Sequence, residues 1–130
     1  MPENVEVARR VLDAINRADL DAVVAHCSEE FEFDFSNSRG PLVGVYRGRK
    51  AAREFWTAFL EPWETLEVEP QEAIELEDGR VLTVNSVRGR GHGSGAEVSS
   101  KGASVWTIRD GQLVTVTMYQ SKEEALDALS

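Results

Sequence analysis

The sequence of 130 residues has one cysteine, two histidines and no apolar run that would span a bilayer. The lone Cys27 excludes a disulfide framework, and its place on the expected buried face of a helix indicates a packed apolar side chain. His26 and His92 are distant and make no metal-ligand set with one cysteine, so neither a metal nor another cofactor is predicted. The opening residues are polar and do not form a signal peptide, which makes the cytoplasm the expected location.

Basic residues are scarce relative to acidic ones, and the formal net charge is −9. An acidic chain does not neutralise phosphates, which argues against nucleic acid as a partner, and no basic amphipathic helix indicates a membrane surface. Most of the acidic excess lies in residues 64–78, which carry seven acidic side chains and no basic one. We interpret this segment as a strand with a solvated outer face; a docking surface for a basic partner is the alternative.

The periodicity of apolar residues predicts both helices and strands. Helical spacing predicts four helices, at residues 3–16, 20–27, 50–60 and 122–129. Extended segments bounded by turn residues predict five strands, at residues 31–35, 66–76, 81–91, 98–109 and 113–120. Pro70 places the first long strand at a bend or an edge. This order predicts one α+β domain over residues 1–130: a cone-shaped, curved mixed or antiparallel sheet around three N-terminal helices, with a short C-terminal helix.

Five segments of the chain together resemble a known family: residues 16–22, 31–35, 46–56, 97–111 and 119–126. They are similar to the SnoaL-like branch of the nuclear-transport-factor-2-like superfamily, which is related to ketosteroid isomerase and polyketide cyclase. The resemblance implies an α+β cone with a pocket. It does not fix an activity, because the superfamily includes isomerases, cyclases, epoxide hydrolases, dehydratases and proteins that only bind or assemble.

The catalytic residues of ketosteroid isomerase are not preserved in this sequence. An ungapped comparison puts its oxyanion tyrosine at Val11, its general-base aspartate at Phe35 and its second oxyanion acid near Val105. Because valine side chains donate no hydrogen bond to an oxyanion, isomerase chemistry is not expected. The acid–arginine–acid relay of epoxide hydrolases is missing as well, since the strand around Arg88 carries no paired acids.

Asp34 and Arg88 are the predicted catalytic residues if the protein is an enzyme. Strand alternation places Ser86, Arg88 and His92 on one face, and the resemblance turns this face toward the pocket. Arg88 would hold an anionic or enolate oxygen there, while Asp34 would act as general acid or base. The alternatives are a structural salt bridge of Arg88 with Asp34 or Glu97, and an Asp34 that points away because the neighbouring phenylalanines face the core.

The sequence leaves open whether the pocket catalyses a reaction. The predicted pocket-lining residues are Tyr46, Trp56, Phe59, Trp63, Ser86, His92, Val105 and Met118. The first hypothesis is a cofactor-independent isomerase, cyclase or hydrolase that acts by proton transfer on a small apolar or partly anionic molecule. The alternative is a non-catalytic domain that binds a hydrophobic ligand or assembles as a dimer. Trp106 and Tyr119 are expected on the opposite sheet face, where aromatic residues suit a homodimer interface.

Overall fold

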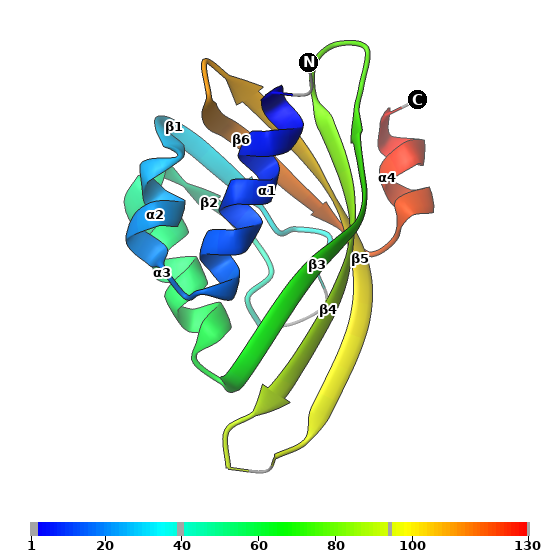
Figure 1. The fold of residues 1–130 in the computed structure, drawn as a ribbon. Coiled ribbons are helices and arrows are strands. Elements are labelled where there is room, and N and C mark those ends of the chain that lie inside the picture. The colour runs from blue at the N-terminus through cyan, green and yellow to red at the C-terminus, as the bar shows by residue number, and fades with distance from the viewer. Residues whose placement is uncertain (1–2, 39–40, 94, 130) are drawn as a thin grey trace.

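The computed structural model describes residues 3–38, 41–93 and 95–129, and Figure 1 shows their arrangement. These residues form the helices α1 (Glu3–Asn16), α2 (Leu20–Ala25), α3 (Gly48–Leu60) and α4 (Lys122–Leu129). They also form the strands β1 (Cys27–Asp34), β2 (Val45–Arg47), β3 (Trp63–Glu75), β4 (Val81–Gly91), β5 (Glu97–Arg109) and β6 (Gln112–Tyr119). In the described part of the chain, no helix is long and apolar enough to cross a membrane.

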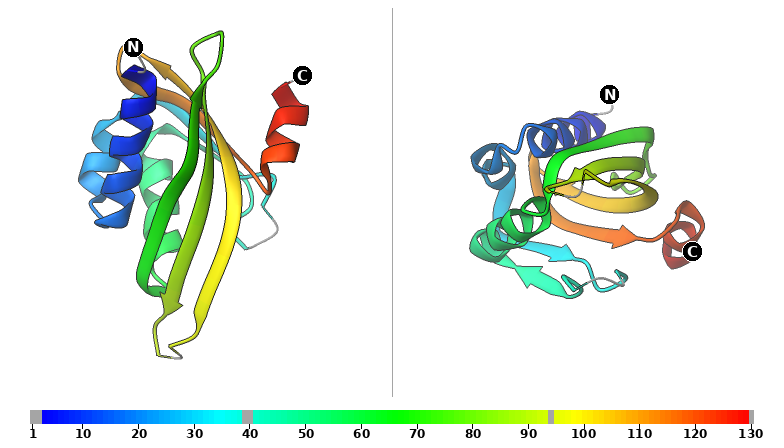
Figure 2. Two further views of the ribbon diagram at one scale, coloured as in Figure 1. Left: turned by 45° about the vertical axis from the view of Figure 1, so that its right-hand side comes forward. Right: turned by 90° about the horizontal axis from the view of Figure 1, so that it is seen from below.

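The strands form one mixed sheet in the order β2-β1-β6-β5-β4-β3. Strands β3 to β6 make an antiparallel meander, whereas β1 runs parallel to β6. The long strands β3, β4 and β5 bend together (Figure 1). Helices α1, α2 and α3 lie on one side of the sheet and α4 lies on the other (Figure 2). The predicted α+β fold, a curved sheet with helices, is therefore confirmed.

We call the sheet face under α1, α2 and α3 the inner face, and the opposite face the outer face. The main core lies on the inner face and combines the apolar stripe of α1 with aromatic residues of β1 and α3; it includes Val11, Leu12, Phe31, Phe33, Phe55 and Trp106. A smaller cluster on the outer face lies beneath α4 and consists of Leu82, Ala103, Val105 and Ala125. The sheet is therefore covered by helices on both faces, although α4 covers only part of the outer one.

Two element boundaries differ from the sequence prediction around residues 26–30. Helix α2 ends at Ala25, because His26 caps it and the chain then enters β1. Strand β1 begins at Cys27, four residues before the predicted start, and its register with β6 shifts between Cys27 and Glu32. This irregularity breaks the alternation of buried and exposed residues, so the early part of β1 has no period of two to reveal it.

Strand β3 lies at one edge of the sheet, as Pro70 predicts, and its pairing with β4 is irregular between Pro70 and Glu72. Helix α1 is hydrogen-bonded to this edge at two points. The Asn16 side chain donates from Nδ2 to the Val68 carbonyl at 2.9 Å and accepts from the Val68 N–H at 2.7 Å. Near the other end of α1, Asn4 Nδ2 donates to the Gly79 carbonyl at 2.9 Å. These contacts hold α1 against the sheet.

Candidate functional site

A cavity of about 80 Å³ lies in the main core, between α1, α2, α3 and the inner face of the sheet. Helix α1 lines it with Val11, Leu12 and Ile15, and the other helices contribute Val23, Trp56 and Phe59. The remaining lining comes from β1, β3, β4, β5 and β6. No carboxylate, histidine, lysine or arginine among the described residues lines this space, so the cavity is suited to an uncharged, largely apolar molecule.

Strand alternation determines which sheet residues reach the cavity. Asn85 and Val87 of β4 face it, as do Ser104 and Trp106 of β5 and Met118 of β6. The antiparallel pairing aligns Ser104 with Met118. These residues therefore form a continuous floor across three neighbouring strands, with polar atoms only near its middle.

The polar groups of the floor are paired with one another, with one exception. Asn85 Nδ2 donates to Ser104 Oγ at 3.3 Å, and Ser104 Oγ donates to Met118 Sδ at 2.8 Å. The indole Nε1 of Trp106 donates to Thr83 Oγ1 at 2.9 Å. Asn85 Oδ1 is buried and accepts no hydrogen bond from any described residue. A buried acceptor without a donor lowers the free energy of unfolding, so a ligand that donates a hydrogen bond to this oxygen would remove an unfavourable contribution.

Aromatic side chains of β1 and α3 form the wall opposite the floor. The Phe33 ring centroid lies 4.6 Å from that of Phe55 and 5.5 Å from that of Trp56, and Trp56 meets Phe59 edge-on at 5.5 Å. Trp56, Phe59 and Met118 are half-buried, whereas Phe33 and Phe55 are almost fully buried. The half-buried members mark the side on which the cavity approaches solvent.

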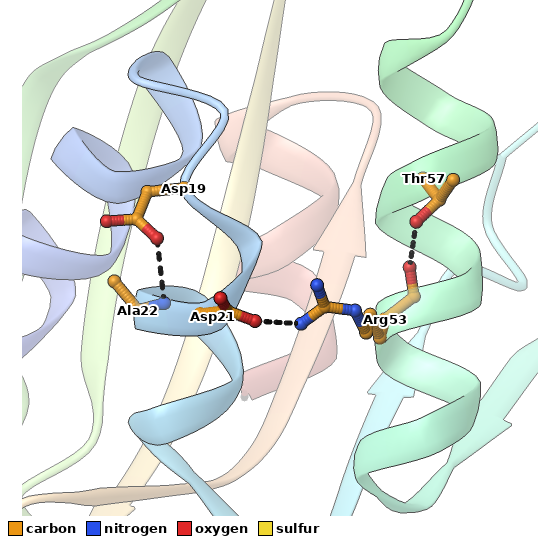
Figure 3. Close-up of polar contacts among 5 residues, drawn as sticks. All are labelled: Asp19, Asp21, Ala22, Arg53 and Thr57. Carbon is orange, nitrogen blue, oxygen red and sulfur yellow. Dashed lines mark hydrogen bonds and ion pairs between the residues drawn. The ribbon is translucent and has the colours of Figure 1, made fainter.

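Helices α2 and α3, which carry part of the lining, are joined at the surface by an ion pair (Figure 3). Arg53 of α3 reaches Asp21 of α2 with an Nη1–Oδ1 distance of 2.6 Å. Asp19 caps α2 by accepting from the Ala22 N–H at 3.1 Å. Because the Arg53 and Asp21 side chains are 48% and 87% exposed, water screens their attraction, and the buried aromatic contacts must hold this wall.

Cys27 also lines the cavity, and its thiol is inert at neutral pH. Burial raises the pKa of Cys27 to about 11, and the positive charge of Arg49 offsets only part of this effect. The Sγ atom donates to the Val23 carbonyl at 3.4 Å. A neutral, hydrogen-bonded thiol of this kind is a packing residue, as the sequence indicates. Among the described residues, no group of three acidic, histidine or cysteine side chains is arranged to hold a metal ion.

Arg88 does not face the cavity, so the predicted orientation of β4 is wrong. Leu82 lies in the outer-face cluster under α4, and alternation puts Ser86 and Arg88 on the same outer side. The Arg88 side chain is 69% exposed, and its Nη2 lies 3.5 Å from Glu67 Oε1. The physical reason is that a strand buried on one face turns its charged residues to water, which leaves Val87 for the cavity.

Asp34 lies near the end of β1 and is not brought together with Arg88. Two strands, β6 and β5, separate β1 from β4. Because Phe33 lines the cavity, Asp34 points to the opposite side of β1, which is the alternative that the sequence left open. Its Oδ1 accepts from the Ser36 backbone N–H at 2.9 Å and from the Ser36 hydroxyl. On this side its charge adds to the effect of burial in raising the pKa of Tyr119.

The other predicted pocket residues divide between the two faces of the sheet. Trp56, Phe59 and Met118 are part of the lining. Val105 is not: it belongs to the cluster beneath α4, since alternation along β5 directs its neighbour Trp106 inward. Ser86 lies on the outer side of β4 for the same reason. The prediction that Trp106 lies on the outer face is therefore also wrong.

Tyr46, Trp63 and His92 lie outside the lining, each for a local reason. The Tyr46 ring packs against Phe55 with a centroid distance of 4.9 Å, behind the aromatic wall. Trp63 lies over the backbone of Gly89, where an added Cβ would be 2.6 Å from the indole ring. His92 is exposed beyond the end of β4, as expected of a turn histidine. None of the three contacts the cavity.

Sequence reasoning missed Asn85, Ser104 and Trp106 because it assigned the wrong faces to β4 and β5. The signal was present in the strand itself. Arg88 and Arg90 share one face of β4, whereas Val87 and Gly89 share the other. Since charged side chains favour solvent, the two arginines predict that the odd-numbered residues of β4, including Asn85, face the core.

The comparison with protein families gives one match: the model of the SnoaL-like domain matches residues 8–116. Among solved structures, Bal32a from a soil-derived mobile gene cassette superimposes with a TM-score of 0.81 at 17% identity, over 97% of this chain and 95% of that chain. A putative polyketide cyclase from Xanthomonas campestris pv. campestris gives a TM-score of 0.74 at 22% identity, over 100% of both chains.

A third similar structure contains a ligand. RV0760c from Mycobacterium tuberculosis, in complex with estradiol-17β-hemisuccinate, superimposes with a TM-score of 0.79 at 10% identity, over 95% of this chain and 96% of that chain. At such identities the likeness to these structures shows the fold alone. Comparison of the sequence with curated proteins gives no match.

Proposed function

Since the chain belongs to the SnoaL-like domain family, we propose that it binds a small, uncharged, largely apolar molecule in the cavity between α1, α2, α3 and the sheet. The observation that carries the proposal is the lining itself. Val11, Phe33, Trp56 and Val116 are part of it, and among the described residues it contains no ionisable acid or base other than the neutral thiol of Cys27. Such a site binds by exclusion of water and by shape.

The size of the cavity indicates a compact ligand. Ligand pockets commonly have volumes of about 300–1,000 Å³, whereas this cavity measures about 80 Å³. A single small ring is therefore the largest occupant that enters without displacing the helices. Met118 lies on the half-buried side, and its unbranched side chain adapts readily to an occupant.

Catalysis by Asp34 and Arg88 receives no support from their positions. Neither side chain reaches the cavity, and each is engaged locally, Asp34 with Ser36 and Arg88 with Glu67. General acid–base catalysis needs a titratable group within hydrogen-bond reach of the bound molecule. The arrangement therefore favours the non-catalytic hypothesis of the two that the sequence raised.

Ligand complexes of similar folds are consistent with this proposal. RV0760c is in complex with estradiol-17β-hemisuccinate, and TerC was co-crystallised with polyporic acid. These structures supply only the precedent that a chain of this fold holds an organic molecule. The identity of the ligand for this chain must come from its own cavity.

The proposal is tested by titrating ¹⁵N-labelled protein with cyclopentane and following the indole N–H resonances. Trp56 and Trp106 line the cavity and are expected to shift with one common dissociation constant, whereas Trp63 lies outside it and serves as an internal control. Val116→Phe, which fills the cavity, is expected to abolish the shifts. Val98→Phe adds the same atoms at a 49% exposed position and is expected to leave them unchanged. Failure of cyclopentane to move the Trp56 and Trp106 signals would refute the proposal.

We also propose the homodimer that the sequence predicts, paired through the outer face of the sheet. On this face the arginines of β4, Arg88 and Arg90, pair with Glu67 of β3 and Glu97 of β5, so these charges are balanced within one protomer and a second copy meets little like-charge repulsion. Sedimentation velocity of the unmodified protein and of Arg88→Glu tests it, with a monomer expected only for the variant. A monomeric unmodified protein would exclude the dimer. The expected cytoplasmic location also remains a prediction.

A further inference from the structure

Asn85 lines the cavity, and its side-chain oxygen is a buried acceptor without a hydrogen-bond donor among the described residues. Asn85 is 3% exposed, and its amide nitrogen already donates to Ser104 Oγ. Its Oδ1 has no donor among the described residues. Leaving such an acceptor buried and unpaired costs free energy, whereas an apolar residue of similar shape would avoid the loss. The position of this amide beside a cavity therefore points to a molecule that supplies the missing donor.

The other polar side chains of the lining are already paired. Ser104 Oγ accepts from Asn85 and donates to Met118, the Trp106 indole N–H donates to Thr83, and the Cys27 thiol donates to the Val23 carbonyl. Ser28 Oγ is also buried without a partner, but Ser28 is not part of the lining. Within the described residues the ligand thus meets one open hydrogen-bond position, in a site that is otherwise apolar.

A water molecule suits this position poorly. Buried waters in proteins make about three hydrogen bonds, and here the described lining offers one free acceptor, Asn85 Oδ1. A cationic donor such as an ammonium group is disfavoured too, because no carboxylate in the described part of the chain lines the cavity to compensate its charge. A neutral hydroxyl attached to an apolar body satisfies both conditions, since it donates one hydrogen bond and leaves the rest of the surface to be filled by carbon.

From this geometry we infer that the ligand is a small cyclic alcohol or phenol whose hydroxyl donates to Asn85 Oδ1. This inference rests on the proposed function and names its ligand class. Asn85 is then the specificity-determining residue, and the aromatic wall of Phe33, Trp56 and Phe59 accommodates the ring. A ketone of the same size has the acceptor but lacks the donor, so two oxygens would face each other and the ketone should bind more weakly.

The test compares cyclopentanol with cyclopentanone, using the same Trp56 and Trp106 indole resonances. The two probes match in size and differ in the hydrogen on oxygen. We expect cyclopentanol to bind about tenfold more tightly, which corresponds to about 1.4 kcal/mol. In Asn85→Leu, where the amide is replaced by an apolar group with the same branching, we expect the two probes to bind equally. Asn85→Leu should still bind cyclopentane, which shows that the cavity persists.

Each outcome decides one of the two claims. Equal binding of the alcohol and the ketone by the unmodified protein overturns the inference and leaves the cavity proposal in place. Tighter binding of cyclopentanone also overturns it, because the amide would then be presenting its N–H₂ group to the ligand. Absence of cyclopentane binding removes the proposed function itself. Because the alcohol-to-ketone ratio is measured on the unmodified protein, the test does not depend on the folding of Asn85→Leu.

Discussion

The side chain of Asn16 makes the two backbone hydrogen bonds to Val68 of β3 that a neighbouring strand would otherwise make. Removal of this side chain provides a test of the structure. Val68 is 8% exposed and lies on the edge strand, so its outward N–H and carbonyl have no strand to pair with. Asn16 satisfies both, at 2.7 Å and 2.9 Å. The substitution Asn16→Ala therefore leaves two backbone groups of one nearly buried residue without partners.

The expected cost follows from the number of bonds. A hydrogen bond contributes about 1 kcal/mol net, and an unpaired buried group costs about 1–3 kcal/mol. Because the two groups are partly buried and regain some hydration, we expect Asn16→Ala to lower the free energy of unfolding by about 2–3 kcal/mol. Asn4→Ala is the matched control: it removes one bond from the same helix, to the Gly79 carbonyl, and should cost about 1 kcal/mol.

Urea denaturation of the two variants measures the difference. Both replace asparagine by alanine within α1, so any gain in helix propensity largely cancels between them. The transition midpoint should fall further for Asn16→Ala, with an unchanged slope. Asn16→Asp keeps an acceptor for the Val68 N–H but turns a carboxylate against its carbonyl, and should be at least as unstable as Asn16→Ala. If Asn16→Ala and Asn4→Ala have the same midpoint, the reasoning is wrong.

Three further predictions concern other parts of the fold. Gly89→Ala should lower the free energy of unfolding by about 1–3 kcal/mol by overpacking, because its Cβ would be 2.6 Å from the Trp63 ring, and Trp63→Leu should relieve part of this in a double-mutant cycle by urea denaturation. The pKa of Cys27 is raised from 9.0 to about 11, so the stabilisation by the neutral thiol is fully present below pH 9 and is lost as the pH rises toward 11. Thermal melts should show a loss of about 2–3 kcal/mol over this range in the unmodified protein and none in Cys27→Val. Alkylation of Cys27 at pH 8 would contradict this prediction. Arg53→Met should change the unfolding free energy by less than about 1 kcal/mol, because its pair with Asp21 is exposed.

The sequence predicted the order of elements well because most of them carry strong local signals. The α1 stripe of Val11 and Ile15 and the alternation of Phe31 and Phe33 each specify an element and its buried face. The start of β1 was missed because the irregularity after Cys27 removes that alternation. Local pattern therefore sufficed wherever the period was unbroken.

The site was harder to predict, because a cavity depends on which face of each strand turns inward. The family resemblance correctly suggests a pocket, but it also suggests that Arg88 faces that pocket. By strand alternation this would place Asn85 on the opposite face, whereas Asn85 lines the cavity. At the start of β4, where Leu82 points outward and Val81 inward, both faces are apolar and alternation does not say which face is the inner one. Only Arg88 and Arg90, further along the strand, mark the outer face. That choice is made by packing partners distant in sequence, here α4 on one face and α1 and α3 on the other.

The parallel pairing of β1 with β6 has a consequence for the order in which the chain folds. Strands β3 to β6 are joined by short connections and form by local contacts, whereas β1 pairs with a strand about 80 residues further along, as in Phe33 with Val116. Because closing so long a loop is slow, we expect it to follow the formation of the local hairpins. Phe33 and Val116 both line the cavity. We therefore expect the cavity to be completed late in folding, because its lining lacks Val116 and Met118 until β6 has been synthesised.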